Sequence, residues 1–301
     1  MKTVEITYRY GVRSAAAPGR PPDADAARTR LSEGNQAFAA LMRASDGASG
    51  TARCLVEVDS RDLGLELRGH EVPRQHPFAA VLGCSDARVP IELIFNEGPN
   101  DLFVVRVAGN GLGSDALGSL RYAIEHLRDS LRLIVVLGHS GCGAVSAAVD
   151  AYLEPAGYLP LTTNHALRAI LDRQFMVVEQ AARKLARTFG ADVTRHERYR
   201  EVLIESSVAT NAALTAYTMQ QELGHDQHAL RTVYGVYLLE SRELWAPRTG
   251  TSETIGLAAP PANPADFVEL GKTIAMSGRI SELLASSQAV ETRTEPRSRQ
   301  K

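Results

Sequence analysis

The chain has 301 residues, of which 44% are hydrophobic and 23% are charged, and its 33 basic and 35 acidic side chains give a formal net charge of −2. These values are typical of a globular protein, and they exclude a collagen, a long coiled coil and a chain disordered along most of its length. Because the charge is balanced, we expect neither nucleic acid nor a membrane surface as a main partner.

Membrane and secretion signals are not expected from this sequence. The longest apolar run lies in residues 131–138, whereas a membrane-spanning helix needs about 20 apolar residues. The N-terminal region has no continuous apolar segment of the kind a secretion signal requires. The three cysteines, Cys54, Cys84 and Cys142, are too few for a disulfide framework. We therefore expect a cytoplasmic protein.

The first part of the chain is predicted to be an extension followed by a helix. Residues 1–27 contain a linker-like stretch rich in Ala, Pro and Arg, with a short strand expected before it. Helical spacing begins near Ala26 and continues through Leu31, Phe38 and Leu41. Residues 45–50 are expected to form a loop because they combine Ser, Asp and Gly.

The middle of the chain alternates between strands and helices. Apolar runs at 78–84, 102–108, 133–138 and 232–238 predict strands, and the first three are too continuous for half-exposed strands, so we expect buried parallel ones. A helical stripe at 117–127 separates the second run from the third, and two longer helical stretches, 164–189 and 196–222, precede the fourth. This alternation predicts an α/β fold with right-handed crossovers.

The sequence thus predicts an N-terminal extension over 1–27, one α/β domain over 28–246 and a C-terminal extension over 247–301. That last extension is rich in Pro and Ala, and we expect it to be largely flexible. One helix is expected within it, at about 265–284, and the charged end at 291–301 is expected to be disordered.

Residues suited to chemistry follow two of the predicted strands. Cys84, Asp86 and Arg88 come after the first strand at alternate positions, which share a face in an extended chain. His139 and Cys142 follow the third strand in a Gly-rich turn. The carboxyl ends of parallel strands form the edge of the sheet where ligands bind. We therefore expect these five side chains to lie close together.

Two thiols and an imidazole are donors that zinc prefers, and three protein ligands leave one position for water, which is the pattern of catalytic sites. Each of these candidate residues also has an ordinary structural interpretation. A buried Cys is often a small hydrophobe, His139 and Cys142 alone indicate a metal only weakly, and Asp86 with Arg88 is compatible with a local ion pair. Cys54 precedes the first strand without a His or Cys at metal spacing, so we predict that it is not a ligand.

Three segments together resemble the β-class carbonic anhydrases: residues 84–90 (CSDARVP), 101–110 (DLFVVRVAGN) and 138–145 (GHSGCGAV). Upstream, residues 31–38 (LSEGNQAF) are similar to the helix that begins this family's domain, and Gln75 stands where the family has a substrate-binding glutamine. The resemblance is strong over about 28–150 and weaker to about 245. Ala87 and Val107 stand where the family often has Ser and Asn.

The resemblance implies a sheet of four parallel strands plus an antiparallel edge strand, flanked by helices, in a homodimer or a dimer of dimers. It implies one Zn²⁺ per chain on Cys84, His139 and Cys142, and reversible hydration of carbon dioxide to bicarbonate and a proton by zinc-bound hydroxide. Asp86 would orient the zinc-bound oxygen, and Arg88 would keep Asp86 off the metal. Gln75 would donate a hydrogen bond to bicarbonate.

Two other functions remain compatible with the same residues. One is a related zinc hydrolase that acts on carbonyl sulfide or carbon disulfide. Such hydrolases differ from carbonic anhydrases in the path by which substrate enters and not in their zinc ligands. The other is a non-catalytic zinc-binding relative. Loss of Asp86 or Arg88 would favour the second alternative, but both residues are present.

Overall fold

The computed structural model describes residues 2–11, 19–47, 50–65, 71–156, 158, 164–222, 230–248 and 256–285, so the end predicted to be disordered lies outside the described residues. The chain forms two units. The first comprises residues 1–140, 212–246 and 253–260, and the second comprises residues 141–211, 247–252 and 261–301.

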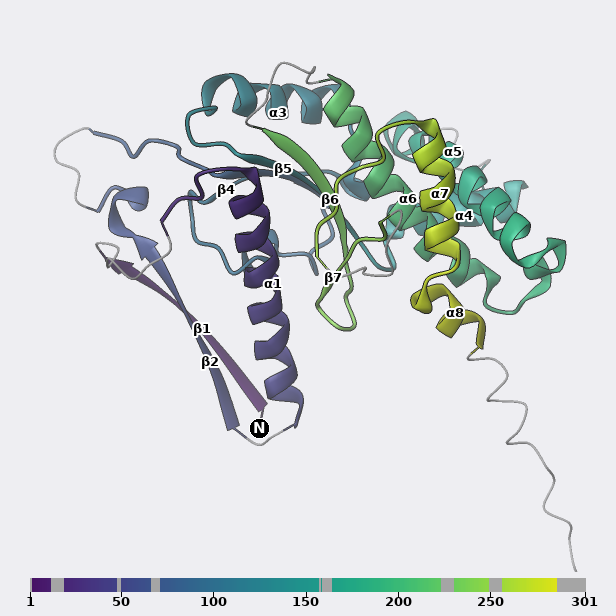
Figure 1. Ribbon diagram of the computed structural model, residues 1–301, viewed down its shortest axis with the longest axis horizontal. Helices are drawn as coiled ribbons and strands as arrows, with labels where there is room; N and C mark the ends of the chain where they lie inside the picture. Colours follow the sequence, from purple (N-terminus) through teal and green to yellow (C-terminus); the bar gives the residue numbers. More distant parts are fainter. Residues whose placement is uncertain are drawn as a thin grey trace, which may run out of the picture. The chain divides into compact units, whose positions relative to one another are not determined.

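A five-stranded sheet forms the centre of the first unit (Figure 1). Its strands, in spatial order, are β4 (Leu102–Arg106), β3 (Ala79–Gly83), β5 (Leu133–His139), β6 (Arg231–Tyr237) and β7 (Leu244–Trp245). The first four pair in parallel, and β7 runs antiparallel to β6. The expected fold class, four parallel strands with an edge strand and flanking helices, is therefore confirmed.

Helix α1 (Ala24–Gly47) covers one face of this sheet with a continuous apolar core. Val81 of β3 and Val135 of β5 are register partners, and both belong to the cluster that includes Leu31 of α1. Side chains alternate between the two faces of a strand. Leu82, which points to the opposite face, is also completely buried. Burial of both faces explains why these strands are continuous apolar runs in the sequence.

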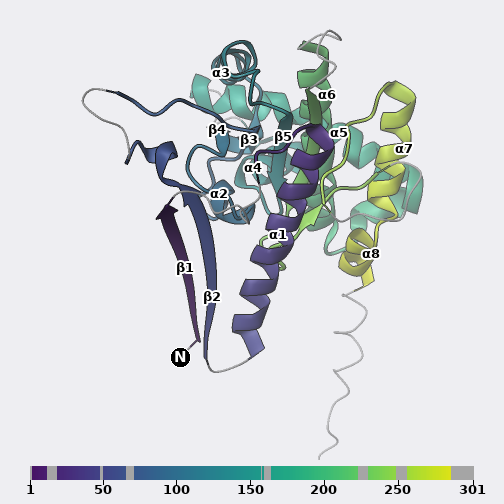
Figure 2. The ribbon, with the colours of Figure 1, turned by 60° about the vertical axis from the view of Figure 1, so that its left-hand side comes forward.

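The other elements of the first unit are short helices and a two-stranded ribbon. The helical elements are η1 (Ser60–Leu63), α2 (Ile91–Ile94), η2 (Ala108–Asn110) and α3 (Ser114–His126). The ribbon pairs β1 (Lys2–Gly11) in parallel with β2 (Gly50–Asp59), and it packs along α1 (Figure 2). β1 is the expected early strand. β2 was not expected, and α1 continues through Gly47, where the sequence predicted a loop.

The second unit is helical. It contains α4 (Gly143–Leu153), α5 (His165–Phe189), η4 (Ala191–Arg195), the first part of α6 (Tyr199–Glu222), α7 (Pro264–Ala275) and α8 (Gly278–Ala285). α5 packs against α4 and α7, and α7 contacts α8. None of the helices in the described part of the chain has an apolar stretch long enough to cross a bilayer.

The range 247–301, expected from composition to be largely flexible, contains the two helices α7 and α8. Asn263 begins α7, because its side chain accepts hydrogen bonds from the backbone N–H groups of Ala265 and Asp266. Ile274 and Ile280 are buried, so each helix contributes to the core of its unit. The single helix predicted at 265–284 is thus two helices, separated after Ala275.

Gly34 of α1 is a position where the fold requires glycine. A Cβ atom added there would overlap the carbonyl oxygen of Phe95, a backbone atom that cannot turn aside. We expect Gly34→Ala to lower the free energy of unfolding by about 1–3 kcal/mol. At the exposed Gly118 of α3, no atom of another described element lies within 4 Å of an added Cβ. Gly118→Ala should therefore raise the same quantity by about 0.5–1 kcal/mol. Urea unfolding measures the free energy of unfolding of both variants. Equal changes in Gly34→Ala and Gly118→Ala would contradict the packing argument.

Candidate metal centre

The ends of two neighbouring strands bring the candidate ligands together. Cys84 directly follows β3, and His139 is the last residue of β5. Because β3 and β5 pair in parallel, their carboxyl ends lie at the same edge of the sheet. Cys142 comes three residues after His139 and immediately before α4. The sequence prediction of where these residues lie is therefore confirmed.

The donor atoms of Cys84, His139 and Cys142 all lie within 4.8 Å of one another, and the three residues are 5%, 0% and 1% exposed. Ligands of a tetrahedral zinc, at about 2.0–2.3 Å from the metal, lie roughly 3.5–4 Å apart. The cluster therefore needs only a small contraction to hold the ion. All three cysteines of the chain are thiols rather than disulfides.

The orientation of His139 fits a metal ligand. Its Nδ1 lies 3.0 Å from the carbonyl oxygen of Ser140. A carbonyl can only accept, so Nδ1 carries the proton and Nε2 presents a lone pair. That Nε2 is buried and has no hydrogen-bond partner among the residues that the structure describes. A buried polar atom without a partner is costly, and a metal ion at this atom would remove the cost.

Backbone groups support the first cysteine. The N–H of Gly109, which has a φ of +64°, donates to the Cys84 sulfur at 3.4 Å. Such a bond favours negative charge on sulfur, and the thiolate is the form that binds metal. Arg106, the last residue of β4, donates to the carbonyl oxygens of Cys84 and Asp86. Arg106 thus fixes the backbone on which the first ligand stands.

Asp86 and Arg88 form the predicted ion pair. The Arg88 backbone N–H and Nε donate to Asp86 Oδ1 at 2.9 and 3.0 Å, and a terminal guanidinium nitrogen donates to Oδ2 at 2.7 Å. These hydrogen bonds hold the pKa of the Asp86 carboxyl well below its usual range, against partial burial, which acts to raise it. Asp86 therefore stays ionised throughout the neutral pH range.

The Asp86–Arg88 pair forms in a turn. The sequence analysis had expected these residues to share a face of an extended strand, and that expectation is wrong. β3 ends at Gly83, and the N–H of Val89 donates to the carbonyl oxygen of Asp86. The turn brings Asp86 Oδ2 to 3.9 Å from His139 Nε2. The carboxylate thus borders the position that a metal on His139 would occupy.

Two other sequence predictions concern residues outside the cluster. Gln75 lies in the irregular segment 71–77 with its side chain exposed, and its predicted role in substrate binding stays a prediction. Cys54 lies on β2 and donates to Asn96 Oδ1 at 3.4 Å. In the part of the chain that the structure describes, Cys54 belongs to no cluster of His, Cys, Asp and Glu side chains that could hold a metal ion. The prediction that it is not a ligand stays a prediction.

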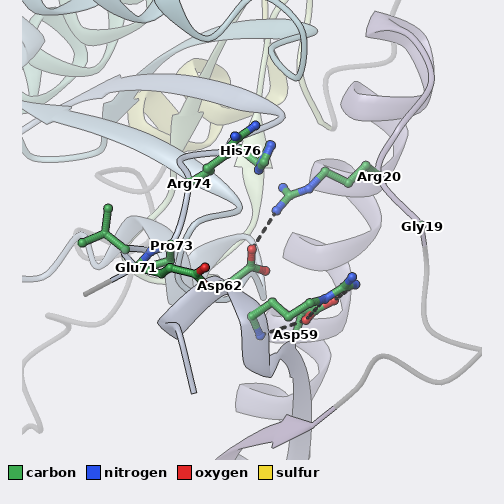
Figure 3. A pocket seen from close by; sticks show the side chains of 10 residues that line it. Gly19, Arg20, Asp59, Asp62, Glu71, Pro73, Arg74 and His76 are labelled. Atoms are coloured by element: carbon green, nitrogen blue, oxygen red, sulfur yellow. Dashed lines mark hydrogen bonds and ion pairs between the residues drawn. The ribbon is translucent and has the colours of Figure 1, made fainter. Parts of the chain in front are cut away.

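A cavity of about 840 Å³ lies in the first unit, and residues on both sides of Gln75 form part of its wall (Figure 3). Arg20 and Asp62, which form an ion pair, line it together with Arg74 and His76. Neither Gln75 nor any of the three candidate ligands belongs to its lining.

A further contact fixes the residue after His139, and sequence reasoning missed it. The Ser140 hydroxyl donates to Glu240 at 3.0 Å and accepts from the N–H of Leu239 at 2.9 Å. Ser140 is 4% exposed. Its carbonyl is the group that sets the orientation of His139, so this hydroxyl helps to hold the ligand through the backbone.

Comparison with known proteins agrees with this centre. The carbonic anhydrase family model matches residues 79–243, which is more than half of the chain. A carbonic anhydrase of Mycolicibacterium smegmatis is 44% identical over 99 residues, covering 32% of this chain and 47% of the relative. Carbonic anhydrase 2 of Mycobacterium tuberculosis is 49% identical over 88 residues, covering 28% and 42%. The chain thus spans less than half the length of these curated relatives.

Among solved structures, a β-carbonic anhydrase of Coccomyxa in complex with acetazolamide is 18% identical. The structural match covers 78% of this chain and 91% of the Coccomyxa chain, with a TM-score of 0.44. The family match includes both strands whose ends carry the cluster, together with Cys84, His139 and Cys142. The chain belongs to the β-class carbonic anhydrase family.

Proposed function

We propose that this protein catalyses the reversible hydration of carbon dioxide to bicarbonate and a proton, with one zinc ion on Cys84, His139 and Cys142. The observation that carries the proposal is the buried sulfur–nitrogen–sulfur cluster beside the ionised Asp86. Within the described part of the chain, the Nε2 of His139 in this cluster has no hydrogen-bond partner. A bound zinc with three protein ligands acidifies water, so that a nucleophile forms near neutral pH.

Asp86 is proposed to orient the attacking water. As a carboxylate it can only accept hydrogen bonds. The nucleophile formed from water would donate its remaining hydrogen to Asp86 and direct a lone pair toward carbon dioxide, while the proton that the water has lost goes to the solvent. Since Asp86 borders His139 Nε2, it is well placed for this role.

Arg88 is proposed to keep Asp86 available for that role. Its side chain engages both carboxylate oxygens, so the attraction of Asp86 toward a nearby cation is opposed by an existing pair of charge-assisted hydrogen bonds. The pair would thereby keep Asp86 off a zinc ion held by Cys84, His139 and Cys142, so that water could bind there. Gln75 is proposed to bind bicarbonate, as the family resemblance implies.

We also propose a cytoplasmic homodimer or dimer of dimers. Thiols rather than disulfides at all three cysteines support a reducing compartment. Tyr10 and Leu55 on the β1–β2 ribbon are 40% and 42% exposed, and an assembly would cover such apolar side chains.

Stopped-flow measurement of carbon dioxide hydration, with metal analysis of the same sample, tests the proposed activity. We expect one zinc per chain, loss of hydration when a chelator removes the metal, and recovery when zinc is returned. A zinc-loaded protein that does not exceed the uncatalysed rate would overturn the proposal. Assays with carbonyl sulfide and carbon disulfide on that sample would then distinguish a related hydrolase from a non-catalytic zinc protein.

A further inference from the structure

The turn between His139 and Cys142 is held by a carboxylate from a distant helix. Gly141, at the centre of this turn, has a φ of +60°, a conformation that favours glycine. Its backbone N–H donates to Glu205 Oε1 at 2.9 Å. Glu205 lies on α6, 64 residues further along the chain, and is 7% exposed. A buried carboxylate thus fixes the backbone between two of the proposed ligands.

The other oxygen of Glu205 is held by Arg279 of α8. Nε and a terminal nitrogen of Arg279 donate to Glu205 Oε2 at 2.9 and 2.6 Å. The Arg279 side chain is 21% exposed and that of Glu205 is 9% exposed, so little solvent screens the pair. Two donors on Oε2 limit the rotation of the carboxylate and leave Oε1 directed at Gly141.

Helix α8, which carries Arg279, is anchored to its unit at two further points. Ile280 is completely buried. His196 Nε2 lies 3.0 Å from the carbonyl oxygen of Leu284, while His196 Nδ1 accepts from the N–H of Arg198 at 3.2 Å. These bonds assign the proton to Nε2, so His196 donates to α8. Arg279 therefore extends from a fixed backbone.

We propose that Glu205 and Arg279 are positioning residues for the metal centre, and that the C-terminal helix α8 thereby supports the zinc ligands. α8 lies outside residues 79–243, which match the family model. Without Arg279, the Glu205 carboxylate would be buried without its cation and would turn toward other donors. Gly141 would then lose this partner, and the turn that spaces His139 and Cys142 would lose one of the contacts that hold it.

The inference rests on the proposed zinc ligands but not on the proposed reaction, so its test measures metal binding. Substitution of a residue that orients a metal ligand typically lowers metal affinity by about 10–100-fold. We expect Arg279→Gln in the full-length chain to raise the zinc dissociation constant at least about tenfold, measured by chelator competition. The absorption bands of the cobalt(II)-loaded variant should also shift, because these bands report the arrangement of sulfur and nitrogen ligands.

Two matched variants separate positioning from a general loss of stability. Arg279→Lys keeps a cation and a donor beside Glu205, so we expect it to restore most of the zinc affinity. Arg183→Gln makes the same chemical change as Arg279→Gln, but it breaks an exposed ion pair with Glu179 on α5. We expect parental zinc affinity and a parental cobalt spectrum from it. Parental affinity and spectrum in Arg279→Gln would overturn the inference, even if that variant unfolds at a lower temperature.

A double variant keeps the inference testable if Arg279→Gln does not fold. Glu205→Gln combined with Arg279→Gln leaves no unpaired charge in the interior. Its amide at position 205 can still accept from Gly141, but no guanidinium fixes its orientation. We expect weaker zinc binding than in the parent, and parental affinity together with a parental cobalt spectrum would refute the positioning role. A chain that binds zinc normally but does not hydrate carbon dioxide would overturn only the proposed function.

Discussion

Cys142→Ser is expected to remove zinc and carbon dioxide hydration together. A serine hydroxyl is a poor substitute for a thiolate, so the metal would keep only Cys84 and His139. Zinc sites that fold with their metal bind it with about 10–16 kcal/mol, and losing one of three ligands should remove roughly a third of that. The corresponding loss of affinity is at least about 100-fold. Zinc content after dialysis and stopped-flow turnover measure the two effects.

Cys54→Ser is the matched control for this experiment. The thiol of Cys54 is partly exposed on β2 and donates a hydrogen bond to the side chain of Asn96. A serine there keeps a donor of similar size, so zinc content and turnover should stay at the parental values. If Cys142→Ser retained full zinc occupancy and full turnover, the proposed ligand set would be wrong.

The sequence located the centre because strand ends are recognisable locally. Continuous apolar runs identified β3 and β5, and parallel pairing then required Cys84 and His139 to lie at one edge. That argument needs only the strand assignments and the residues that follow them. The order of the strands and the exact hydrogen bonds of Asp86 with Arg88 were not needed to place these residues near one another.

The supporting contacts were not predictable in the same way. Arg106, Glu205 and Arg279 act on groups that lie 22, 64 and 74 residues away in the sequence. No local pattern distinguishes them from the other charged residues of the chain. Gly109 acts through its backbone N–H, which every residue except proline possesses. Only the three-dimensional structure assigns these residues to the centre.

The unexpected strand β2 had a local signal. Ala52, Cys54, Val56 and Val58 alternate with more exposed positions, and Val56 and Val58 are buried. This is the period-two pattern of a half-buried strand. The Ser, Asp and Gly residues at 45–50 indicated a loop, and the strand that follows them was not predicted. Alternation over 50–59, weighed separately from the flanking residues, would have predicted this strand.

Arg88→Ala is expected to retain zinc but to lose roughly 10²-fold in turnover, the size of effect that misplaced reacting groups produce. Without Arg88, the Asp86 carboxylate loses the pair that holds it. Its Oδ2 already lies 3.9 Å from His139 Nε2, and a small movement would make it a fourth zinc ligand. A crystal structure of the zinc-loaded variant should show Asp86 on the metal, and stopped-flow assays from pH 6 to 9 should show the loss throughout.

The chain provides a matched control for this substitution. Arg61 donates to Asp59 through its backbone N–H, Nε and a terminal nitrogen, which is the same set of bonds that joins Arg88 to Asp86. The Arg61 pair includes none of the candidate ligands. Arg61→Ala should therefore leave zinc content and turnover at parental values. Parental turnover in Arg88→Ala over the whole pH range would refute the role given to the Asp86–Arg88 pair.

Asp86→Ala separates the two roles within the pair. It also keeps zinc, since Cys84, His139 and Cys142 remain, and its turnover falls because the attacking water loses its acceptor. In the double variant with Asp86→Ala and Arg88→Ala, no carboxylate remains to occupy the fourth position. If Arg88 acts only through Asp86, the double variant should match Asp86→Ala in turnover, so the two losses should not add. A double variant far slower than Asp86→Ala would instead mean that Arg88 contacts the reacting groups itself.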